Sequence, residues 1–416
     1  MDLTGKKLLI LGGSATSIDI VEAAKRLGVY TIVTDWYDTK RSPAKLIADE
    51  YWNEEIFKPE RIAELIKEHH VDGVFTGFTD SYLLQYQRIC ELSGLPCYAT
   101  KEVFEITMDK ARFKQLCRDN GVPVIPEYEL ATFDPNTITE NNKVIIKPVD
   151  NSGSRGVILC KNPDDFQKCL EYARSFSEKK LVIIEKYMEM DSITISYIIQ
   201  DGVITLSTVN DRYVHKAPNG SAVACRSVYP SQYMQRFLEN INGKLCAMYR
   251  KIGVKNGIIS IQFFTDGTDF YALEMGHRLT GGQHYAITKV ENGTSSLDQL
   301  IHFAITGSMA DYSIAEKENP YFKHVYCHLY ILGKQGKIAR FEGLDYLKSL
   351  PGLLHFSQKK MVGDTIGPDG TAAQKVVGVH LQMKDRNDLN RIMQDIQKKF
   401  HFYDEDGNDL TLELMN

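Results

Sequence analysis

The stretch that decides the fold is "IISIQFFTDGTDFYALEMGHRLTGG", residues 258–282. Two apolar runs flank the turn-forming segment "TDGTD", which predicts an antiparallel β-hairpin centred near Thr268. That register puts Gln262 directly opposite Glu274, with their Cβ atoms about 5 Å apart on one face. The two side chains offer hard oxygen ligands, which suit Mg²⁺ completed by phosphate and water. The hairpin alone leaves the alternative open that they form an ordinary polar pair on a solvated face.

The end of the second strand carries a further combination of residues. Arg278 follows Glu274 after four residues, and the pair Gly281-Gly282 comes next. An acid, a base and a flexible glycine pair at the end of a well-formed strand indicate a binding site.

Toward the N-terminus, residues 6–13, "KKLLILGG", predict a buried parallel strand that ends in a glycine-rich turn. The amphipathic segment "SIDIVEAAKRLG" and the strand "YTIVTD" complete a strand–helix–strand unit, and the pattern repeats. Residues 1–105 are therefore expected to form a doubly wound α/β domain. Its turn "GGSATS" lacks the third glycine of a dinucleotide fingerprint, which argues against an NAD-dependent dehydrogenase. Thr79 and Asp80 follow the strand "VDGVFTG", at the strand end where α/β folds bind ligands.

The remainder of the chain predicts a multidomain α/β and α+β protein. Residues 106–320 read as a second domain, with a lid at about 122–190 and a catalytic core at about 191–320. A loop of about twenty residues is expected at 210–231, within that core. Residues 321–416 read as a separate small α+β domain.

The overall composition narrows the class of protein. The net charge of −5 and the sequence pI near 6.2 argue against a nucleic-acid-binding protein. No apolar run approaches the roughly 20 residues of a membrane helix. Eight cysteines are scattered without a C-x-x-C pair, which indicates reduced thiols in a cytoplasmic protein.

Two further segments suggest nucleotide binding. In "IIKPVDNSGSRGV", residues 145–157, a strand ends at Lys147 and a loop rich in glycine and serine carries Arg155. Backbone N–H groups of such loops cradle phosphates, although a tight hairpin turn is the alternative. In "VIIEKYM", residues 182–188, an apolar strand breaks into a polar hinge that can offer an adenine ring a backbone C=O and N–H. A strand that simply leaves the core would look the same.

Taken in order, these segments resemble the ATP-grasp superfamily over about residues 1–310. The elements that carry the resemblance are Lys110, Lys147 with its loop, "EKYM", Gln262, Glu274 and Arg278. The pattern looks most like the synthetase units of carbamoyl-phosphate synthase, which hold metal with Gln and Glu across a hairpin. The glycine pair and the C-terminal part look more like the L-amino-acid ligases, which are carboxylate–amine ligases.

The resemblance implies the nucleotide-binding residues. Lys110 and Lys147 would contact the ATP phosphates. A mobile loop would close over them, formed by Ser152, Gly153, Ser154, Arg155, Gly156 and Val157. The adenine hinge would be Glu185, Lys186 and Met188, with the C=O of Lys186 and the N–H of Met188 facing the ring.

The resemblance also implies the reacting end of the site. Gln262 and Glu274 would hold Mg²⁺, with Mn²⁺ as a substitute, and Arg278 would steady the transferring phosphate and the acyl-phosphate. Backbone N–H groups of Gly281 and Gly282 would lie near the substrate carboxylate.

Two positions depart from the family pattern. Gly276 stands where the family usually has a metal-binding asparagine, and the neighbouring His277 should point to the other face of the strand. The usual ribose-binding glutamate is also missing, so Asp191 or Ser192 would serve. Both changes bear on how many metal ions bind and on whether turnover is retained.

The expected function is ATP-dependent ligation of a small carboxylate, such as an amino acid, to an amine through an acyl-phosphate. Carboxyphosphate or carbamate chemistry, and a nucleotide-binding protein without turnover, remain as alternatives. The loop at 210–231 is expected to reach the acceptor, with Arg226 or His215 binding a carboxylate, although a solvated basic loop is an equal alternative. The C-terminal part would either cover the site or form a homodimer interface.

Overall fold

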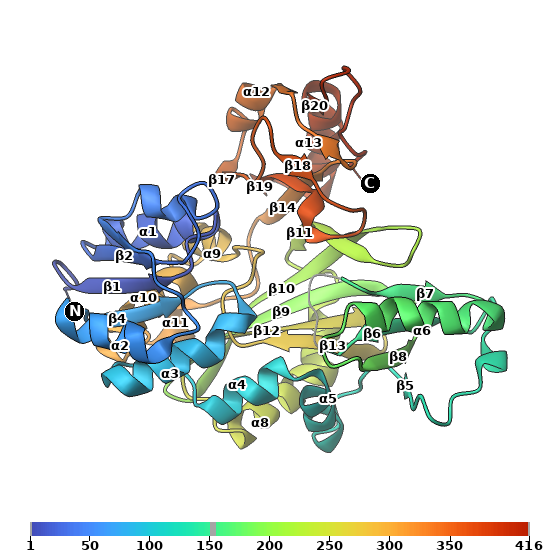
Figure 1. Ribbon diagram of the computed structural model, residues 1–416, viewed down its shortest axis with the longest axis horizontal. Helices are drawn as coiled ribbons and strands as arrows, with labels where there is room; N and C mark the ends of the chain where they lie inside the picture. Colours follow the sequence, from blue (N-terminus) through green and yellow to red (C-terminus); the bar gives the residue numbers. More distant parts are fainter. Residues whose placement is uncertain (1, 150–154, 415–416) are drawn as a thin grey trace.

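The computed structural model describes residues 2–149 and 155–414 (Figure 1). Its first part is a sheet of four parallel strands. In spatial order they are β3 (Glu50–Trp52), β2 (Tyr30–Thr34), β1 (Lys7–Leu11) and β4 (Gly73–Thr76). The accompanying helices are α1 (Ser17–Arg26), α2 (Pro59–Glu68) and α3 (Leu83–Ser93). The apolar run of β1 is almost fully buried, as expected of a parallel strand covered on both faces. The predicted doubly wound α/β architecture is present.

Helices from much later in the chain complete this first part. They are α9 (Tyr285–Glu291), α10 (Ser296–Thr306) and α11 (Ile314–Lys317). Helix α10 packs on β4 so closely that a Cβ atom at Gly73 would lie 2.4 Å from the carbonyl oxygen of Ala304. Glycine is therefore required at this contact, and the first hydrophobic core includes residues from Leu3 to Ile314.

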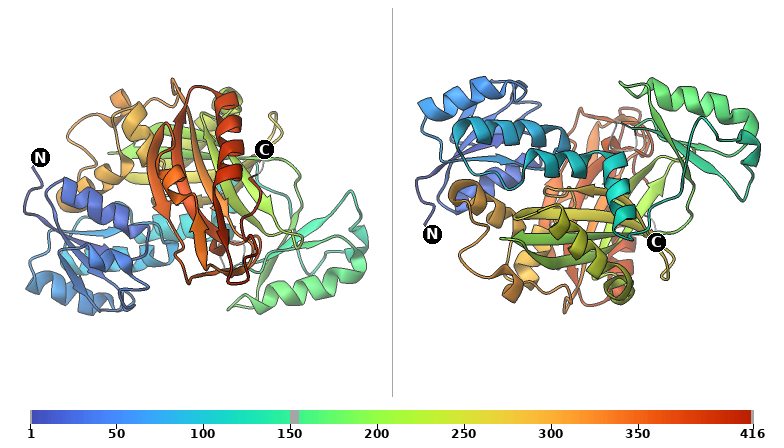
Figure 2. Two further views of the ribbon diagram at one scale, coloured as in Figure 1. Left: turned by 90° about the horizontal axis from the view of Figure 1, so that it is seen from above. Right: turned by 90° about the horizontal axis from the view of Figure 1, so that it is seen from below.

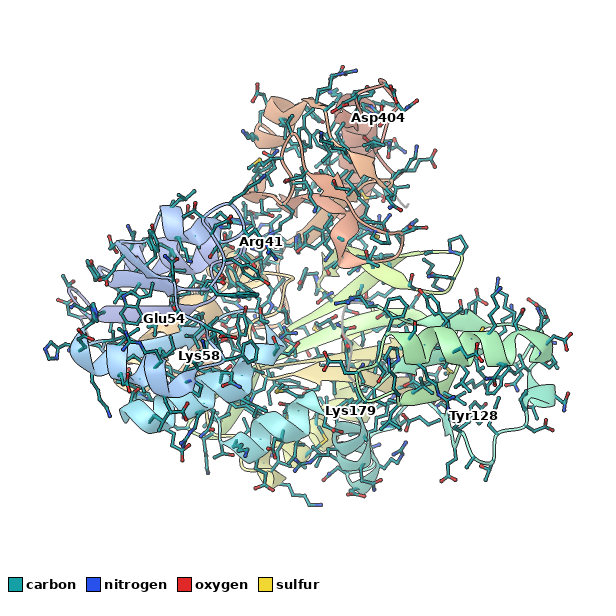
Figure 3. All side chains as sticks on the ribbon, viewed as in Figure 1. Arg41, Glu54, Lys58, Tyr128, Lys179 and Asp404 are labelled. Atoms are coloured by element: carbon teal, nitrogen blue, oxygen red, sulfur yellow. The ribbon has the colours of Figure 1, made fainter. Side chains whose placement is uncertain are left out.

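The second part is a small antiparallel sheet at the right of Figure 1. Its strands, in spatial order, are β5 (Glu127–Tyr128), β8 (Val182–Lys186), β6 (Val144–Pro148) and β7 (Ile158–Cys160), and α6 (Phe166–Ser175) packs on it. Helices α4 (Lys101–Met108) and α5 (Lys110–Asp119) lead into it from the first part. In Figure 3, Tyr128 marks this small sheet, and Glu54 and Lys58 mark the first part.

An antiparallel sheet of eight strands forms the centre of the molecule. In spatial order its strands are β13 (Phe270–Gly276), β12 (Gly257–Thr265), β9 (Asp191–Gln200), β10 (Val203–Lys216), β11 (Ala222–Tyr229), β14 (Val325–Leu332), β19 (Lys375–Met383) and β17 (Leu353–Gln358). Helices α7 (Met234–Phe237) and α8 (Gly243–Lys251), joined by a π-helical turn, contribute to the core packed against the first of these strands.

The last three strands of this sheet come from the C-terminal segment. Figure 2 shows that segment between the first part and the small sheet when the molecule is seen from above. It has its own hydrophobic core beneath α13 (Arg386–Lys399), with α12 (Leu344–Lys348) nearby. Two short strand pairs complete it: β15 (Gly336–Lys337) with β18 (Thr365–Ile366), and β16 (Arg340–Glu342) with β20 (His401–Tyr403). Because β14 bonds directly to β11, the predicted boundary near residue 320 runs through one continuous sheet.

The prediction of a long loop at residues 210–231 is wrong. Strand β10 continues to Lys216 and β11 begins at Ala222, so only a tight turn separates them. In that turn the N–H of Ala217 donates to the carbonyl of Ser221 at 2.8 Å, and Gly220 has a φ of +85°. The strands escaped detection because polar side chains occupy the positions that face the cavity described below.

Two further expectations concern the whole chain. None of the described helices combines the length and apolar character needed to cross a membrane. All eight cysteines are free, as their scattered spacing predicts.

Candidate active site

The two predicted metal ligands lie directly opposite each other on β12 and β13, which confirms the predicted hairpin register. Gln262 Oε1 is buried without a hydrogen-bond partner. Within the described residues, the carboxylate of Glu274 makes neither a hydrogen bond nor an ion pair. Two unsatisfied hard oxygens on one face fit a shared Mg²⁺. In the same described part, no three His, Cys, Asp or Glu side chains form a metal site, so phosphate and water would complete the coordination.

The neighbouring positions explain why this pair has no third ligand. Gly276 lies opposite Ser260, and a Cβ atom there would have no neighbour closer than 3.8 Å. A side chain would fit, but the chain has none at this point. His277 is fully buried on the other face, as predicted, with Nε2 3.0 Å from the carbonyl oxygen of Asn256. Burial lowers the pKa of His277 to about 4, so it stays neutral and distant from the metal pair.

A cavity of about 670 Å³ joins this hairpin to the small sheet and to the C-terminal strands. Its lining includes most of the residues predicted from the sequence. They are Lys110, Lys147, Arg155, Val157, Glu185, Lys186, Met188, Asp191, Arg226, Gln262, Glu274, Arg278, Gly281 and Gly282. Gly156 and His215 do not line this cavity, and Ser152, Gly153 and Ser154 lie outside the described residues.

Basic side chains gather at the end of the cavity next to Gln262 and Glu274. Lys110 is the first residue of α5, whose N-cap Asp109 accepts hydrogen bonds from Ala111 and Arg112. Burial, together with repulsion from Lys147, lowers the pKa of Lys110. Cations that repel one another at the edge of a cavity favour the binding of a polyanion there.

Lys147 is held in place by a buried ion network. Its ammonium lies 2.6 Å from Glu185, which also pairs with the fully buried Lys114. Lys114 in turn bonds Glu127 at 2.5 Å. Burial alone would raise the pKa of Glu185, but Lys147 and Lys114 outweigh burial and hold it below the usual range. Glu185 therefore serves here through its side chain, by orienting Lys147.

Replacing Lys114 by methionine tests this network. The change leaves Glu185 and Glu127 without their shared cation, and breaking a buried pair on one side costs about 3–5 kcal/mol. We expect a clear loss of stability in chemical unfolding, and a raised pKa for Glu185. The control Lys168→Met removes an exposed lysine from α6. A Lys114 variant no less stable than this control would contradict the network's role.

The adenine hinge residues occupy the expected place at the end of β8. Lys186 uses its N–H to bond the carbonyl of Pro126 at 2.9 Å, and the N–H of Met188 donates to no other described residue. Asp191 lines the cavity and accepts a hydrogen bond from the hydroxyl of Tyr233. A free N–H beside apolar side chains such as Ile125 is compatible with adenine binding, which remains a prediction.

The end of the predicted phosphate loop is shaped by one glycine. Gly156 has a φ of +77°, and a Cβ atom there would lie 2.6 Å from Phe176 and 2.7 Å from Pro148. No other residue fits without displacement. The exposed Arg155 precedes it at the edge of the cavity.

Arg278 forms an ion pair that sequence reasoning did not foresee. Its Nε donates to Asp80 Oδ1 at 2.6 Å and its Nη2 contacts Oδ2 of the same carboxylate. Asp80 follows β4 of the first part, so this bidentate pair connects two parts of the molecule across the cavity edge. The carboxylate fixes the plane of the guanidinium beside Glu274.

The two basic residues predicted to bind the acceptor have other partners. His215 pairs through Nε2 with Asp369 at 2.7 Å, away from the main cavity. Arg226 borders the cavity, but its guanidinium lies 4.0 Å from the ring centre of Tyr213 and contacts Met393. The structure thus brings Arg226 to the cavity and leaves His215 outside it.

Several lining residues were missed by sequence reasoning as members of the site. They are Asn210, Arg212, Ser227, His284, His328, Tyr330 and Lys375. Burial and repulsion from Arg212 and Lys359 lower the pKa of Lys375 to about 7. Arg212 belongs to the segment misread as a loop, and no local motif marks the residues of β14 and β19.

Comparisons with known proteins show which proteins share this sequence pattern and fold. Residues 140–286 match the family described as ATP-grasp domain. The chain is 24% identical over 290 residues to formate-dependent phosphoribosylglycinamide formyltransferase of Sulfurisphaera tokodaii, covering 66% of this chain and 70% of that protein. The enzyme of the same name from Bacillus subtilis is 26% identical over 227 residues, which is 52% of this chain and about half, 53%, of that protein.

Solved structures share the fold over nearly the whole chain. The L-amino acid ligase of Bacillus licheniformis superposes with a TM-score of 0.79 at 16% identity, covering 97% of this chain and 99% of that one. The biotin carboxylase domain of 2-oxoglutarate carboxylase from Hydrogenobacter thermophilus superposes with a TM-score of 0.74 at 19% identity. The match covers 96% of this chain and 91% of that one. The predicted fold class is confirmed: residues 140–286 match an ATP-grasp domain, and the chain shares its fold with these structures over nearly its whole length.

Proposed function

We propose that this protein is an ATP-dependent carboxylate–amine ligase that works through an acyl-phosphate. One observation carries the proposal: the buried, unpaired oxygen of Gln262 and the exposed carboxylate of Glu274 lie opposite each other on a cavity that Lys110, Lys147 and Arg278 also line. Oxygen ligands beside several fixed cations suit Mg²⁺ and a triphosphate. Relatives with the same domain are named as enzymes that use formate or amino acids, which are small carboxylates.

The chemistry explains why such a site needs these residues. A carboxylate is a poor electrophile because oxide would have to leave, and transfer of the γ-phosphate converts that oxygen into a good leaving group. The obstacle is that two anions must meet. Mg²⁺, where bound, would neutralise phosphate charge, and Gln262 and Glu274 would hold it.

The chain's own cations supply the rest of the stabilisation. Lys147, oriented by Glu185, and Lys110 would bind the phosphates of ATP. Arg278, whose plane is fixed by Asp80, would stabilise charge on the transferring phosphoryl group. An amine would then attack the acyl carbon, forming the C–N bond and releasing phosphate. The protein's contribution is positioning and electrostatic stabilisation rather than covalent catalysis.

Release of phosphate from ATP tests this function. The purified protein would be supplied with Mg²⁺, ATP and L-amino acids, singly and in pairs, and separately with bicarbonate. We expect release that depends on an amino acid. Release that depends only on bicarbonate would instead support carbamoyl-phosphate-synthase-like chemistry.

A second candidate is a nucleotide-binding protein without turnover. The observation that favours it is Gly276, which leaves the metal site with two protein ligands although a side chain would fit. Tight binding of ATP without phosphate release under any of these conditions would support this candidate and refute the ligase.

A further inference from the structure

The glycine pair at the end of the hairpin is held by side chains of the C-terminal strands. The hydroxyl of Tyr330, on β14, donates to the carbonyl oxygen of Gly281 at 2.6 Å. Nε2 of His380, on β19, lies 3.0 Å from the carbonyl oxygen of Gly282. Two consecutive carbonyl groups of a cavity-lining segment are therefore fixed from the same direction in the fold.

The identity of the donors follows from the acceptors. A carbonyl oxygen cannot donate, so Nε2 of His380 carries the proton and Nδ1 is the unprotonated nitrogen. Burial, with repulsion from His355, lowers the pKa of His380 to about 3, and burial raises the pKa of Tyr330. Both groups consequently remain neutral donors across the physiological pH range.

A row of histidines keeps His380 in this orientation. His328, His380 and His355 are directly opposite one another on three neighbouring strands. The rings of His328 and His380 stack at 3.8 Å with an interplanar angle of 19°, and His355 packs on His380 at 5.4 Å. The ring of Tyr330 lies 4.2 Å from His328, so both donors belong to one packed face.

The same segment is also anchored by the first part of the molecule, whose Asp19 lies 3.6 Å from Nε2 of His355. The fully buried Gln283 donates to Asp19 of α1 at 2.5 Å, and the hydroxyl of Tyr285 contacts the same oxygen. Residues 281–285 are thus held between two other parts of the fold.

These contacts determine which backbone N–H groups of residues 281–283 can still donate to a bound ligand. In a trans peptide the N–H points away from the preceding carbonyl, so the bond from Tyr330 also fixes the direction of the Gly282 N–H. The N–H of Gln283 is used by the carbonyl of Thr280 at 3.1 Å. The N–H groups of Gly281 and Gly282 donate to no other described residue, although both glycines line the cavity.

We propose that Tyr330 and His380 are positioning residues for the carboxylate of the substrate. Tyr330 sets the direction of the Gly282 N–H, His380 holds the peptide that follows and so the backbone of Gly282, and the unused N–H groups of Gly281 and Gly282 bind the carboxylate. This inference rests on the proposed ligase function. It gives the C-terminal strands a direct part in the site, because their side chains hold both carbonyl groups of the glycine pair.

The experiment compares Tyr330→Phe and His380→Leu with two controls. Tyr326→Phe removes a buried hydroxyl from the same strand, whose partner is Glu291 at 2.6 Å and which does not line the cavity. His380→Gln keeps an N–H donor. Hydrogen–deuterium exchange of residues 279–285 and the KM values for ATP and for the carboxylate that best supports phosphate release would be measured.

We expect faster exchange of residues 279–285 in Tyr330→Phe and His380→Leu, and a KM for the carboxylate raised about tenfold by each lost hydrogen bond. The KM for ATP should not change, Tyr326→Phe should behave as the unmodified protein, and His380→Gln should recover most of the affinity. An active enzyme whose two variants show unchanged exchange, or equal increases in both KM values, would overturn the inference. Absence of phosphate release from the unmodified protein would instead refute the proposed function on which it rests.

Discussion

Replacing Glu274 by alanine is expected to lower ATP turnover by at least about a hundredfold. The substitution removes the only charged member of the proposed metal pair, and a catalytic metal contributes several kcal/mol of transition-state stabilisation. Its carboxylate makes no hydrogen bond and no ion pair with another described residue, so folding should be little affected. Amino-acid-dependent phosphate release at saturating ATP and Mg²⁺ measures the effect.

The hairpin itself offers a matched control for this variant. Asp269→Ala removes the same charge from the exposed turn between β12 and β13, away from the cavity. This control should retain turnover, and Glu274→Gln should fall with the alanine variant because a neutral amide binds Mg²⁺ more weakly. Full turnover by Glu274→Ala would rule out Gln262 and Glu274 as the metal site.

Arg278→Lys is expected to lower kcat by about 10²–10³-fold. Lysine keeps the charge but cannot reproduce the planar, multidentate contact of a guanidinium, and removal of one preorganised donor from a transition state has an effect of this size. Single-turnover phosphate transfer is the appropriate measurement, because it separates the chemical step from product release.

Asp80→Asn separates the two roles of Arg278. It removes the ion pair with Asp80 while leaving the guanidinium in the site, and the Asp80 side chain is 41% exposed, so the pair itself should contribute only about 1 kcal/mol or less. We expect a loss of less than about tenfold in this variant. If Asp80→Asn lost as much activity as Arg278→Lys, the pairing between the two parts, rather than contact with phosphate, would explain the need for Arg278.

The hairpin was predictable from sequence because local signals determine it. Turn residues lie between two apolar runs, and the predicted pairing of Gln262 with Glu274 is present, although the pairs next to the turn are centred between Gly267 and Thr268 and a bulge restores the predicted pairing. This β-bulge lies between Gln262 and Phe263, and no residue pattern in this stretch of sequence predicts it. The adjoining His277 was also placed correctly on the opposite face, because side chains alternate along a strand.

The second half of β10 and the whole of β11 were not recognised because they line a cavity. A strand of an ordinary core alternates polar and apolar residues, but here Asn210, Arg212 and Ser227 face the site and disrupt that pattern. The buried Lys114 was missed for a similar reason. Within its helix it looks like any solvated lysine, and only the fold reveals the two carboxylates beside it.

The histidine row and Tyr330 could not be foreseen from sequence for a different reason. His328, His355 and His380 are far apart along the chain and belong to no motif. They meet because three strands after residue 320 extend a sheet that begins at the hairpin of β12 and β13. A short stretch of sequence does not determine which distant strands pair with one another.

The continuity of that sheet has a practical consequence for anyone preparing shorter versions of the protein. A truncation just before β14 would not yield a smaller, self-contained catalytic unit, because it would remove one of the two strands hydrogen-bonded to β11 and leave that edge of β11 exposed. Exposed strand edges recruit other chains and promote aggregation. Expression of this protein in fragments should therefore keep residues 191–414 together.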